Sequence, residues 1–145
     1  MTRKKSLRFI KAISLNDKKI TALVVEDSAA SLKYMEFLLI KLGVKMVDSA
    51  SGEKTLEIID ECDVDCMLID INLGTGMSGI ELVERLRQKV ELNHLPIFAV
   101  TAYSNDEFID EMLEAGFNNY LTKPYNLDML RTLLAEYLSL DGTNK

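Results

Sequence analysis

The sequence has no apolar run that approaches the roughly 18 residues needed to span a bilayer. Its basic N-terminus also lacks the uninterrupted apolar stretch and small-residue cleavage site of a signal peptide. Glycine and proline are few, at seven and two in 145 residues, so the composition does not indicate disorder. These absences predict a cytoplasmic protein with no membrane span. The length predicts a single domain large enough to bury a core.

Histidine and cysteine are scarce as well. The chain has one histidine, His94, and two cysteines, Cys62 and Cys66. A structural zinc site usually takes four such ligands, so the sequence does not support one. We interpret the two cysteines as reduced, partly buried thiols of a reducing compartment.

Charge is distributed unevenly along the chain. Residues 1–19 carry seven Lys or Arg and one Asp, for a net charge of +6, whereas the other 126 residues carry ten basic and 22 acidic side chains, for −12. An acidic body argues against binding of nucleic acid by the main domain. We interpret residues 1–19 as a basic N-terminal extension or linker that could touch nucleic acid or anionic lipid, residues 20–140 as the domain, and residues 141–145 as a tail.

From Ile20 onward, short apolar runs alternate with longer segments of helical period, which predicts an α/β fold with a parallel sheet. The expected strands are 20–25, 44–47, 66–70, 96–101 and 119–122, and the expected helices are 28–43, 51–62, 80–90, 106–116 and 127–140. Right-handed crossovers then put helices on both faces of the sheet. The strand at 44–47 contains a polar Lys45, as an edge strand would.

Local signals mark several of the helix ends. Ser78 with Glu81, and Ser104 with Glu107, have capping-box spacing. Asn126 can cap the last helix, and Gly43 is placed to end the first one.

Polar side chains follow four of the five predicted strands. Glu26 and Asp27 end the first strand, Asp70 the third, Thr101 the fourth and Lys123 the fifth. The carboxyl ends of parallel strands meet at one edge of the sheet, so these groups should gather there. Converging carboxylates repel one another, and a divalent cation such as Mg²⁺ (or Mn²⁺) removes that conflict.

A carboxylate, a hard cation, an ammonium and a hydroxyl together suit phosphoryl transfer. The chain has no GxxxxGK[ST] loop for a nucleotide, because the glycine-rich stretch 74–79 lacks the Lys-Ser/Thr ending. The phosphoryl group is therefore expected from another protein or from a small phosphodonor.

Four groups in this order, the acidic pair, the lone Asp, Thr-Ala and Lys-Pro, resemble the receiver domain of two-component response regulators, the family of the stand-alone chemotaxis regulators. The resemblance covers about residues 20–140. It implies a (βα)₅ flavodoxin-like three-layer sandwich whose five-stranded parallel sheet has the order 2-1-3-4-5. It also implies a protein that is not an enzyme beyond its own phosphorylation and dephosphorylation.

The resemblance implies the metal-binding roles residue by residue. Asp70 matches the phosphoacceptor and is also a metal ligand. Asp27 matches a direct Mg²⁺ ligand, Glu26 a ligand acting through water, and Asn72 a residue that offers its backbone carbonyl to the metal.

The resemblance also implies a switch. Thr101 would swing toward the phosphoryl group, Lys123 would pair with it, and Tyr120 matches an aromatic ring that turns inward when Thr101 moves. Lys123-Pro124 resembles the family's cis peptide bond. The switched surface would comprise the fourth helix, fifth strand and fifth helix, about residues 104–140.

Three features depart from the commonest family pattern. The acidic pair is Glu-Asp rather than Asp-Asp, and the loop after Asp70 is one residue longer and has no proline. Tyr103 follows the Thr-Ala pair, where a bulky ring would hinder attacking water, so we predict slow self-dephosphorylation.

The expected partners are a histidine kinase or a histidine phosphotransfer protein, a downstream protein, and a second copy of the chain in a homodimer. The chain is either a stand-alone regulator or a fragment of a larger protein such as a hybrid kinase. Two other function classes stay open. A phosphatase of the haloacid-dehalogenase type would need a second Asp at position 72, where this chain has Asn72. A pseudo-receiver would keep the fold without being phosphorylated.

Overall fold

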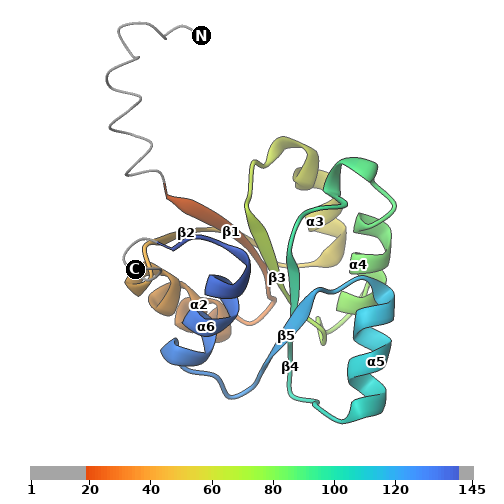
Figure 1. Ribbon diagram of the computed structural model, residues 1–145. Coiled ribbons are helices and arrows are strands. Elements are labelled where there is room, and N and C mark those ends of the chain that lie inside the picture. The colour runs from red at the N-terminus through yellow and green to blue at the C-terminus, as the bar shows by residue number, and fades with distance from the viewer. Residues whose placement is uncertain (1–18, 141–145) are drawn as a thin grey trace, which may run out of the picture.

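The computed structural model describes residues 19–140, which form a three-layer α/β sandwich (Figure 1). The predicted extension at 1–19, apart from Lys19, and the predicted tail at 141–145 lie outside the described residues. The five strands are β1 (Ile20–Val25), β2 (Val44–Ser49), β3 (Cys66–Asp70), β4 (Ile97–Thr101) and β5 (Asn119–Thr122). The helices are α2 (Ala29–Lys41), α3 (Gly52–Ile58), α4 (Gly79–Leu86), α5 (Asp106–Ala115) and α6 (Leu127–Tyr137), with 3₁₀ turns η1 (Ile59–Glu61) and η2 (Val90–Leu92).

All strand pairs are parallel, and the strand order is β2-β1-β3-β4-β5, which confirms the predicted topology. Strands β3 and β4 are buried along their whole length, as expected for inner strands covered on both faces. Strand β2 lies at the edge of the sheet and exposes Lys45 and Asp48.

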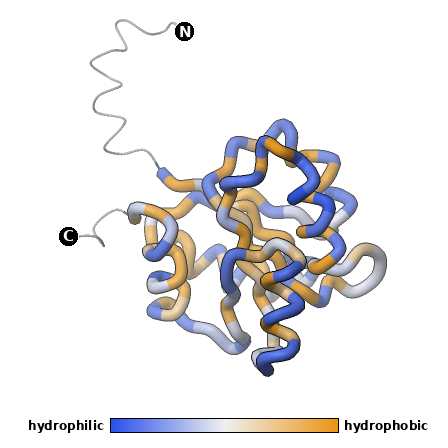
Figure 2. Tube along the Cα trace, turned by 45° about the vertical axis from the view of Figure 1, so that its right-hand side comes forward, coloured by the Kyte–Doolittle hydropathy of each residue, from blue (hydrophilic) through white to orange (hydrophobic). Residues whose placement is uncertain are grey.

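Alternate side chains of each strand belong to two separate cores. In the hydropathy-coloured trace, hydrophobic segments run through the middle of the molecule (Figure 2). Helices α2 and α6 cover one face, where Leu39 and Leu134 pack with Phe98 of β4. Helices α3, α4 and α5 cover the other, where Leu82 and Met112 belong to the second cluster. Within residues 19–140, no helix is both long and apolar enough to cross a membrane.

Helix boundaries largely follow the local signals in the sequence. Ser78 accepts the backbone N–H of Glu81 at 3.1 Å, and Asn126 accepts that of Met129 at 2.9 Å, so both predicted caps are confirmed. Gly43 has φ +74°, a conformation that favours glycine, and its N–H bonds to Ile40 at the end of α2.

Some boundary predictions were wrong. The cap of α5 is Asn105, whose side chain accepts the N–H of Phe108 at 2.8 Å, and not Ser104, because the Asn amide oxygen sits one residue closer to the helix. The helix predicted at 51–62 is α-helical only over Gly52–Ile58 and tightens to a 3₁₀ turn. The helix predicted at 80–90 ends at Leu86 and the last helix at Tyr137.

Candidate functional site

The predicted polar groups do meet at the carboxyl edge of the sheet. Val25 pairs with Ile69, and Asp70 pairs with Val100, so Glu26 and Thr101 directly follow the residues that flank the end of β3. The chain leaves β1 toward β2 on one side and later returns to β3 on the other. This edge is therefore the topological switch point at which open α/β sheets form their sites.

Asp70 is the most deeply placed acid at this edge, with 5% of its side chain exposed. Its Oδ2 lies 2.9 Å from the Nζ of Lys123, and its Oδ1 accepts the backbone N–H of Asn72 at 2.9 Å. An ion pair and a backbone hydrogen bond together offset the cost of burying the carboxylate.

Glu26 is also buried, and its carboxylate accepts the N–H of Ser28 at 2.9 Å. Burial first, and then the hydrogen bond and negative charge of Asp70, raise the pKa of Glu26 from 4.5 to about 7, after the lowering effects of Ser28 and Lys123 are included. Two buried carboxyl groups, those of Glu26 and Asp70, therefore lie close together beside the ammonium of Lys123.

Asp27 lies exposed at the rim, under the loop that follows β3. Gly74 of that loop has φ +74°, and a Cβ there would lie 2.6 Å from Oδ2 of Asp27. Position 74 therefore requires glycine for two reasons. Its backbone adopts a positive φ, and the Asp27 carboxylate lies too close to leave room for a Cβ. The longer loop folds back onto the acidic pair.

These donors fit a hard divalent cation. Glu26, Asp27 and Asp70 would provide carboxylate oxygens, and Asn72 would add a backbone carbonyl, which are the ligand types that Mg²⁺ prefers. Burial first, and then the hydrogen bond and negative charge of Asp70, raise the pKa of Glu26, and a cation bound beside both carboxylates would oppose that shift. In the part of the chain that the structure describes, no three acidic, histidine or cysteine side chains form a ready-made cation cluster. A cation would have to draw the carboxylates together.

Thr101 ends β4 with only 2% of its surface exposed. Its hydroxyl accepts the N–H of Tyr103 at 2.9 Å, and its carbonyl accepts the N–H of Lys123 at 2.8 Å. This backbone hydrogen bond joins the two site residues, Thr101 at the end of β4 and Lys123 just after β5. Across residues 19–140, no hydrogen bond links the Thr101 hydroxyl to Asp70.

Comparison with known proteins agrees with this geometry. The model of the response regulator receiver domain matches residues 22–135. The chain belongs to this family. It is therefore a receiver domain of two-component response regulators, and the expected fold and family are confirmed.

The matched segment makes up a different share of each of two relatives found by sequence. A cyclic di-GMP phosphodiesterase of Thermotoga maritima is 34% identical over 119 residues, which are 82% of this chain but 31% of the relative. The chemotaxis protein CheY-3 of Vibrio cholerae is 33% identical over 119 residues, 81% of this chain and 91% of the relative. The receiver thus spans about a third of the phosphodiesterase but almost all of the chemotaxis protein.

Two solved structures have the same fold. One is the receiver domain of a sensor histidine kinase from Pseudomonas aeruginosa with a magnesium ion in its active-site cleft, at 26% identity, TM-score 0.75, and coverage of 82% of this chain and 97% of that one. The other is the receiver of the Saccharomyces cerevisiae regulator Ssk1 in complex with the histidine phosphotransfer protein Ypd1, at 27% identity, TM-score 0.74, and coverage of 82% and 88%.

The predicted switch residue Tyr120 is half-buried in this receiver and packs against the core beneath α5. Tyr103 is 56% exposed, and its ring makes an edge-to-face contact with Phe108 of α5, with centroids 5.2 Å apart. The Lys123-Pro124 peptide bond is cis, as the family resemblance implied.

The sequence pattern missed two residues, Tyr34 and Tyr125, that support the segment just after Lys123. The hydroxyl of Tyr34 on α2 donates to the carbonyl of Tyr125 at 2.8 Å, and the two rings pack with centroids 5.4 Å apart. Burial, followed by the charges of Glu26, Tyr34 and Asp70, raises the pKa of Tyr125 to about 12. No short-range signal identifies this pair, because its members are 91 residues apart.

Proposed function

We propose that this receiver accepts a phosphoryl group on Asp70, from a histidine kinase or a histidine phosphotransfer protein, in a reaction that requires Mg²⁺. The observation that carries the proposal is the 2.9 Å contact between Asp70 and Lys123 at the switch point of the sheet. A buried carboxylate held in place by an ion pair is positioned to act as a nucleophile.

The transfer exchanges one bond for another. A carboxylate oxygen of Asp70 bonds to phosphorus while the P–N bond of the phosphohistidine breaks, and that electron pair stays with the imidazole. Glu26, Asp27, Asp70 and the carbonyl of Asn72 would hold the metal. When bound, Mg²⁺ (or Mn²⁺) supplies positive charge against the phosphoryl oxygens. The magnesium ion reported for the Pseudomonas receiver supports this assignment.

Lys123 and Thr101 respond to the new dianionic group. In our proposal the Lys123 ammonium moves its contact from Asp70 to a phosphoryl oxygen, and the Thr101 hydroxyl gives up the Tyr103 N–H to donate to another. Tyr120 then turns inward. The reaction on Asp70 is the only catalysis we propose.

The phosphodonor is proposed to dock on α2. Tyr34, Phe37 and Ile40 lie at helical spacing on one face of α2 and are 43%, 56% and 67% exposed. Tyr34 also lines a pocket of about 360 Å³ together with Lys123, so this apolar face continues into the site. The reported complex of the yeast receiver with a histidine phosphotransfer protein supports a partner of this class.

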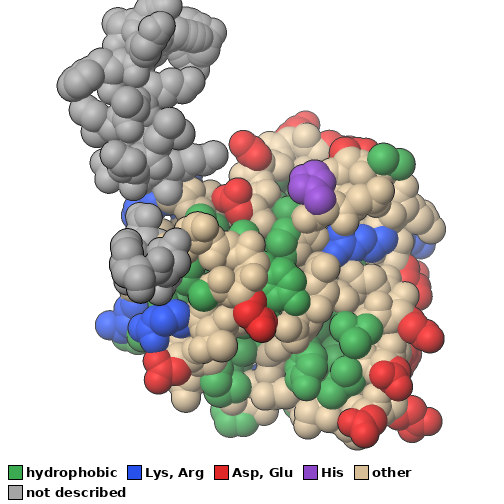
Figure 3. All heavy atoms as spheres, viewed as in Figure 1, with side chains coloured by type: hydrophobic (Ala, Val, Ile, Leu, Met, Phe, Trp, Pro, Cys, Tyr) green, Lys and Arg blue, Asp and Glu red, His purple; other side chains and the backbone are tan. Residues whose placement is uncertain are grey.

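The output surface is proposed to be α5, β5 and α6. It includes a groove of about 450 Å³ between β5 and α6, lined by Tyr120 and Met129 among others. Acidic side chains gather on the side of α5 (Figure 3). We propose that a downstream protein binds this surface. If two copies of the chain bind each other there instead, sedimentation of the protein alone will show a homodimer. Cytoplasmic location stays a prediction, as does the choice between a stand-alone regulator and part of a hybrid kinase.

The test is the mass of the intact protein after incubation with acetyl phosphate, with Mg²⁺ or with EDTA. A single phosphoryl adduct that forms only with Mg²⁺ is the expected result. An adduct that forms equally in EDTA would contradict the metal requirement. No adduct, together with no Mg²⁺ binding by calorimetry, would favour a pseudo-receiver. Turnover of a chromogenic phosphate ester would instead favour a phosphatase.

A further inference from the structure

The loop that joins β3 to α4, residues 71–78, rests on the start of α3. Leu73 and Met77 of the loop are buried, with 4% and 8% of their surfaces exposed. A Cβ on Gly52, the first residue of α3, would lie 3.0 Å from the sulfur of Met77. The absence of a side chain at Gly52 therefore lets the loop settle against the helix.

Glu53, the next residue of α3, holds the backbone of this loop. Its Oε2 accepts the N–H of Met77 at 3.0 Å. A Cβ on Gly76, where φ is +85°, would lie 3.0 Å from Oε2 and 3.3 Å from Oε1, so both carboxylate oxygens face the loop. A charged acceptor makes a stronger hydrogen bond to an N–H than a neutral one.

The turn that carries Glu53 is itself fixed. The buried Thr55 hydroxyl lies 2.8 Å from the carbonyl of Ser51 and 2.9 Å from the hydroxyl of Ser49. The carbonyl of Ser49 in turn accepts the N–H of Glu26 at 3.0 Å. One rigid turn is thus bonded both to an acid of the site and to the loop beyond Asp70.

The loop needs such a support because of its composition. It includes Gly74 and Gly76, and glycine loses more conformational freedom on ordering than any other residue. The same loop carries Asn72, whose N–H bonds to Asp70, and brings Gly74 against Asp27. Release of the Met77 end would free both of these contacts.

We propose that Glu53 is a positioning residue for the metal and phosphoryl site, acting through the Met77 N–H on the loop that carries Asn72 and lies against Asp27. This inference rests on the proposed function, which it deepens. Glu53 itself touches neither the phosphoacceptor nor the metal ligands.

The experiment compares Glu53→Ala, Glu53→Gln and the control Glu57→Ala. Glu57 lies on the same helix, is exposed, and has Lys54 as its ion-pair partner at 3.9 Å. Calorimetric titration with Mg²⁺ alone, without phosphodonor, measures the affinity. Amide hydrogen exchange measures protection at Met77, and the Mg²⁺ dependence of phosphorylation by acetyl phosphate separates affinity from the maximal rate.

For Glu53→Ala we expect Mg²⁺ affinity to fall about five-fold, the size of one hydrogen bond of about 1 kcal/mol, with faster exchange at Met77. The maximal rate at saturating Mg²⁺ should change less than about two-fold. Glu53→Gln keeps an acceptor oxygen but loses its charge, so it should lose less affinity than Glu53→Ala. Glu57→Ala should match the wild type in every readout.

Unchanged Mg²⁺ affinity in Glu53→Ala would overturn the inference, as would an equal loss in Glu57→Ala or in Glu53→Gln, because the effect would then be one of charge alone. Unchanged exchange at Met77 would also overturn it. If the wild type bound no Mg²⁺ and took up no phosphoryl group, the proposed function would fail, while exchange at Met77 would still decide whether Glu53 holds the loop.

Discussion

The ammonium of Lys123 lies 2.9 Å from Oδ2 of Asp70, although 53 residues separate the two in the chain. Glu26 lies close enough to Asp70 that, after burial, the hydrogen bond and negative charge of Asp70 help to raise the pKa of Glu26. One lysine therefore serves two buried acids, and the stability of the site depends on what else neutralises them.

Replacement of this lysine by Lys123→Ala should destabilise the metal-free protein by about 1–2 kcal/mol, since it leaves a buried carboxylate unpaired but the lysine is itself partly screened by solvent. Urea unfolding in EDTA measures the change. Saturating Mg²⁺ should recover part of the loss, because a cation replaces the missing charge. A variant as stable as the wild type in EDTA would mean that the pair contributes nothing to folding.

Glu26 predicts a pH dependence of the metal-free protein. Its folded pKa of about 7 lies above the ordinary 4.5, so the folded state binds the extra proton, and the resulting stability is present below pH 4.5 and lost as pH rises through 7. Relative to wild type, Glu26→Gln should therefore gain stability between pH 5 and pH 8, by on the order of 2–3 kcal/mol. Urea unfolding in EDTA at both pH values, with Glu57→Gln as the control, measures the gain. Parallel pH profiles for wild type and Glu26→Gln would refute the prediction.

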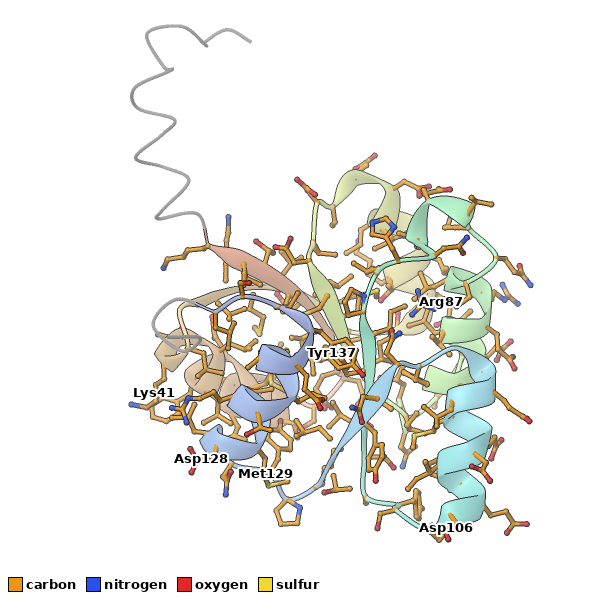
Figure 4. The ribbon with its side chains drawn as sticks, viewed as in Figure 1. Lys41, Arg87, Asp106, Asp128, Met129 and Tyr137 are labelled. Carbon is orange, nitrogen blue, oxygen red and sulfur yellow. The ribbon has the colours of Figure 1, made fainter. Side chains whose placement is uncertain are left out.

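Arg87, at the end of α4, predicts a stability effect that is separate from the site (Figure 4). Its guanidinium donates to the carbonyls of Gly116 and Leu92 and to the side chain of Asn118, at 2.7–2.9 Å. Arg87→Ala should cost about 2 kcal/mol in the free energy of unfolding. Arg87→Lys should recover less than half, because an ammonium cannot reproduce the planar fork.

The matched control for Arg87 is Arg85→Ala, since Arg85 is exposed and makes only a surface ion pair with Glu81 at 3.6 Å. Thermal unfolding should separate the two arginines clearly. Phosphorylation of folded Arg87→Ala by acetyl phosphate should proceed as in the wild type. Equal destabilisation by the two alanine variants would contradict the role given to Arg87.

If the phosphodonor protein docks on α2, a substitution on the exposed face of this helix should slow transfer from the protein donor but not from acetyl phosphate. Phe37→Ala removes a ring that is 56% exposed and contacts Lys41, at 4.8 Å from ammonium to ring centroid. Transfer from a phosphorylated histidine phosphotransfer protein that is active on the wild type should slow about ten-fold, whereas phosphorylation by acetyl phosphate should be unchanged. A loss with both donors, or with neither, would argue against docking on α2.

Where one strand end carried one polar group, the sequence predicted which groups meet at this edge of the sheet, although their roles stay predictions. Asp70 directly follows the apolar residues 66–69, Lys123 directly follows the short strand 119–122, and parallel topology then brings the two together. Helix ends were predicted less reliably, because Ser104 and Asn105 are both good caps and only backbone geometry selects Asn105. Contacts between distant loops could not be predicted. Glu53 looks like any acid in a first helical turn, and its bond to Met77 depends on how the loop folds.

If Asp70 is the phosphoacceptor, the phosphoryl adduct must lie on its side chain, and peptide mass spectrometry can locate it. The protein is phosphorylated with acetyl phosphate and Mg²⁺, the acyl phosphate is trapped by borohydride reduction, and the modified peptide is sequenced by mass spectrometry beside Asp70→Asn. We predict one modified residue, Asp70, and no adduct in the variant. A modification at Asp27 or elsewhere in the wild type, or an adduct that persists in Asp70→Asn, would contradict the claim.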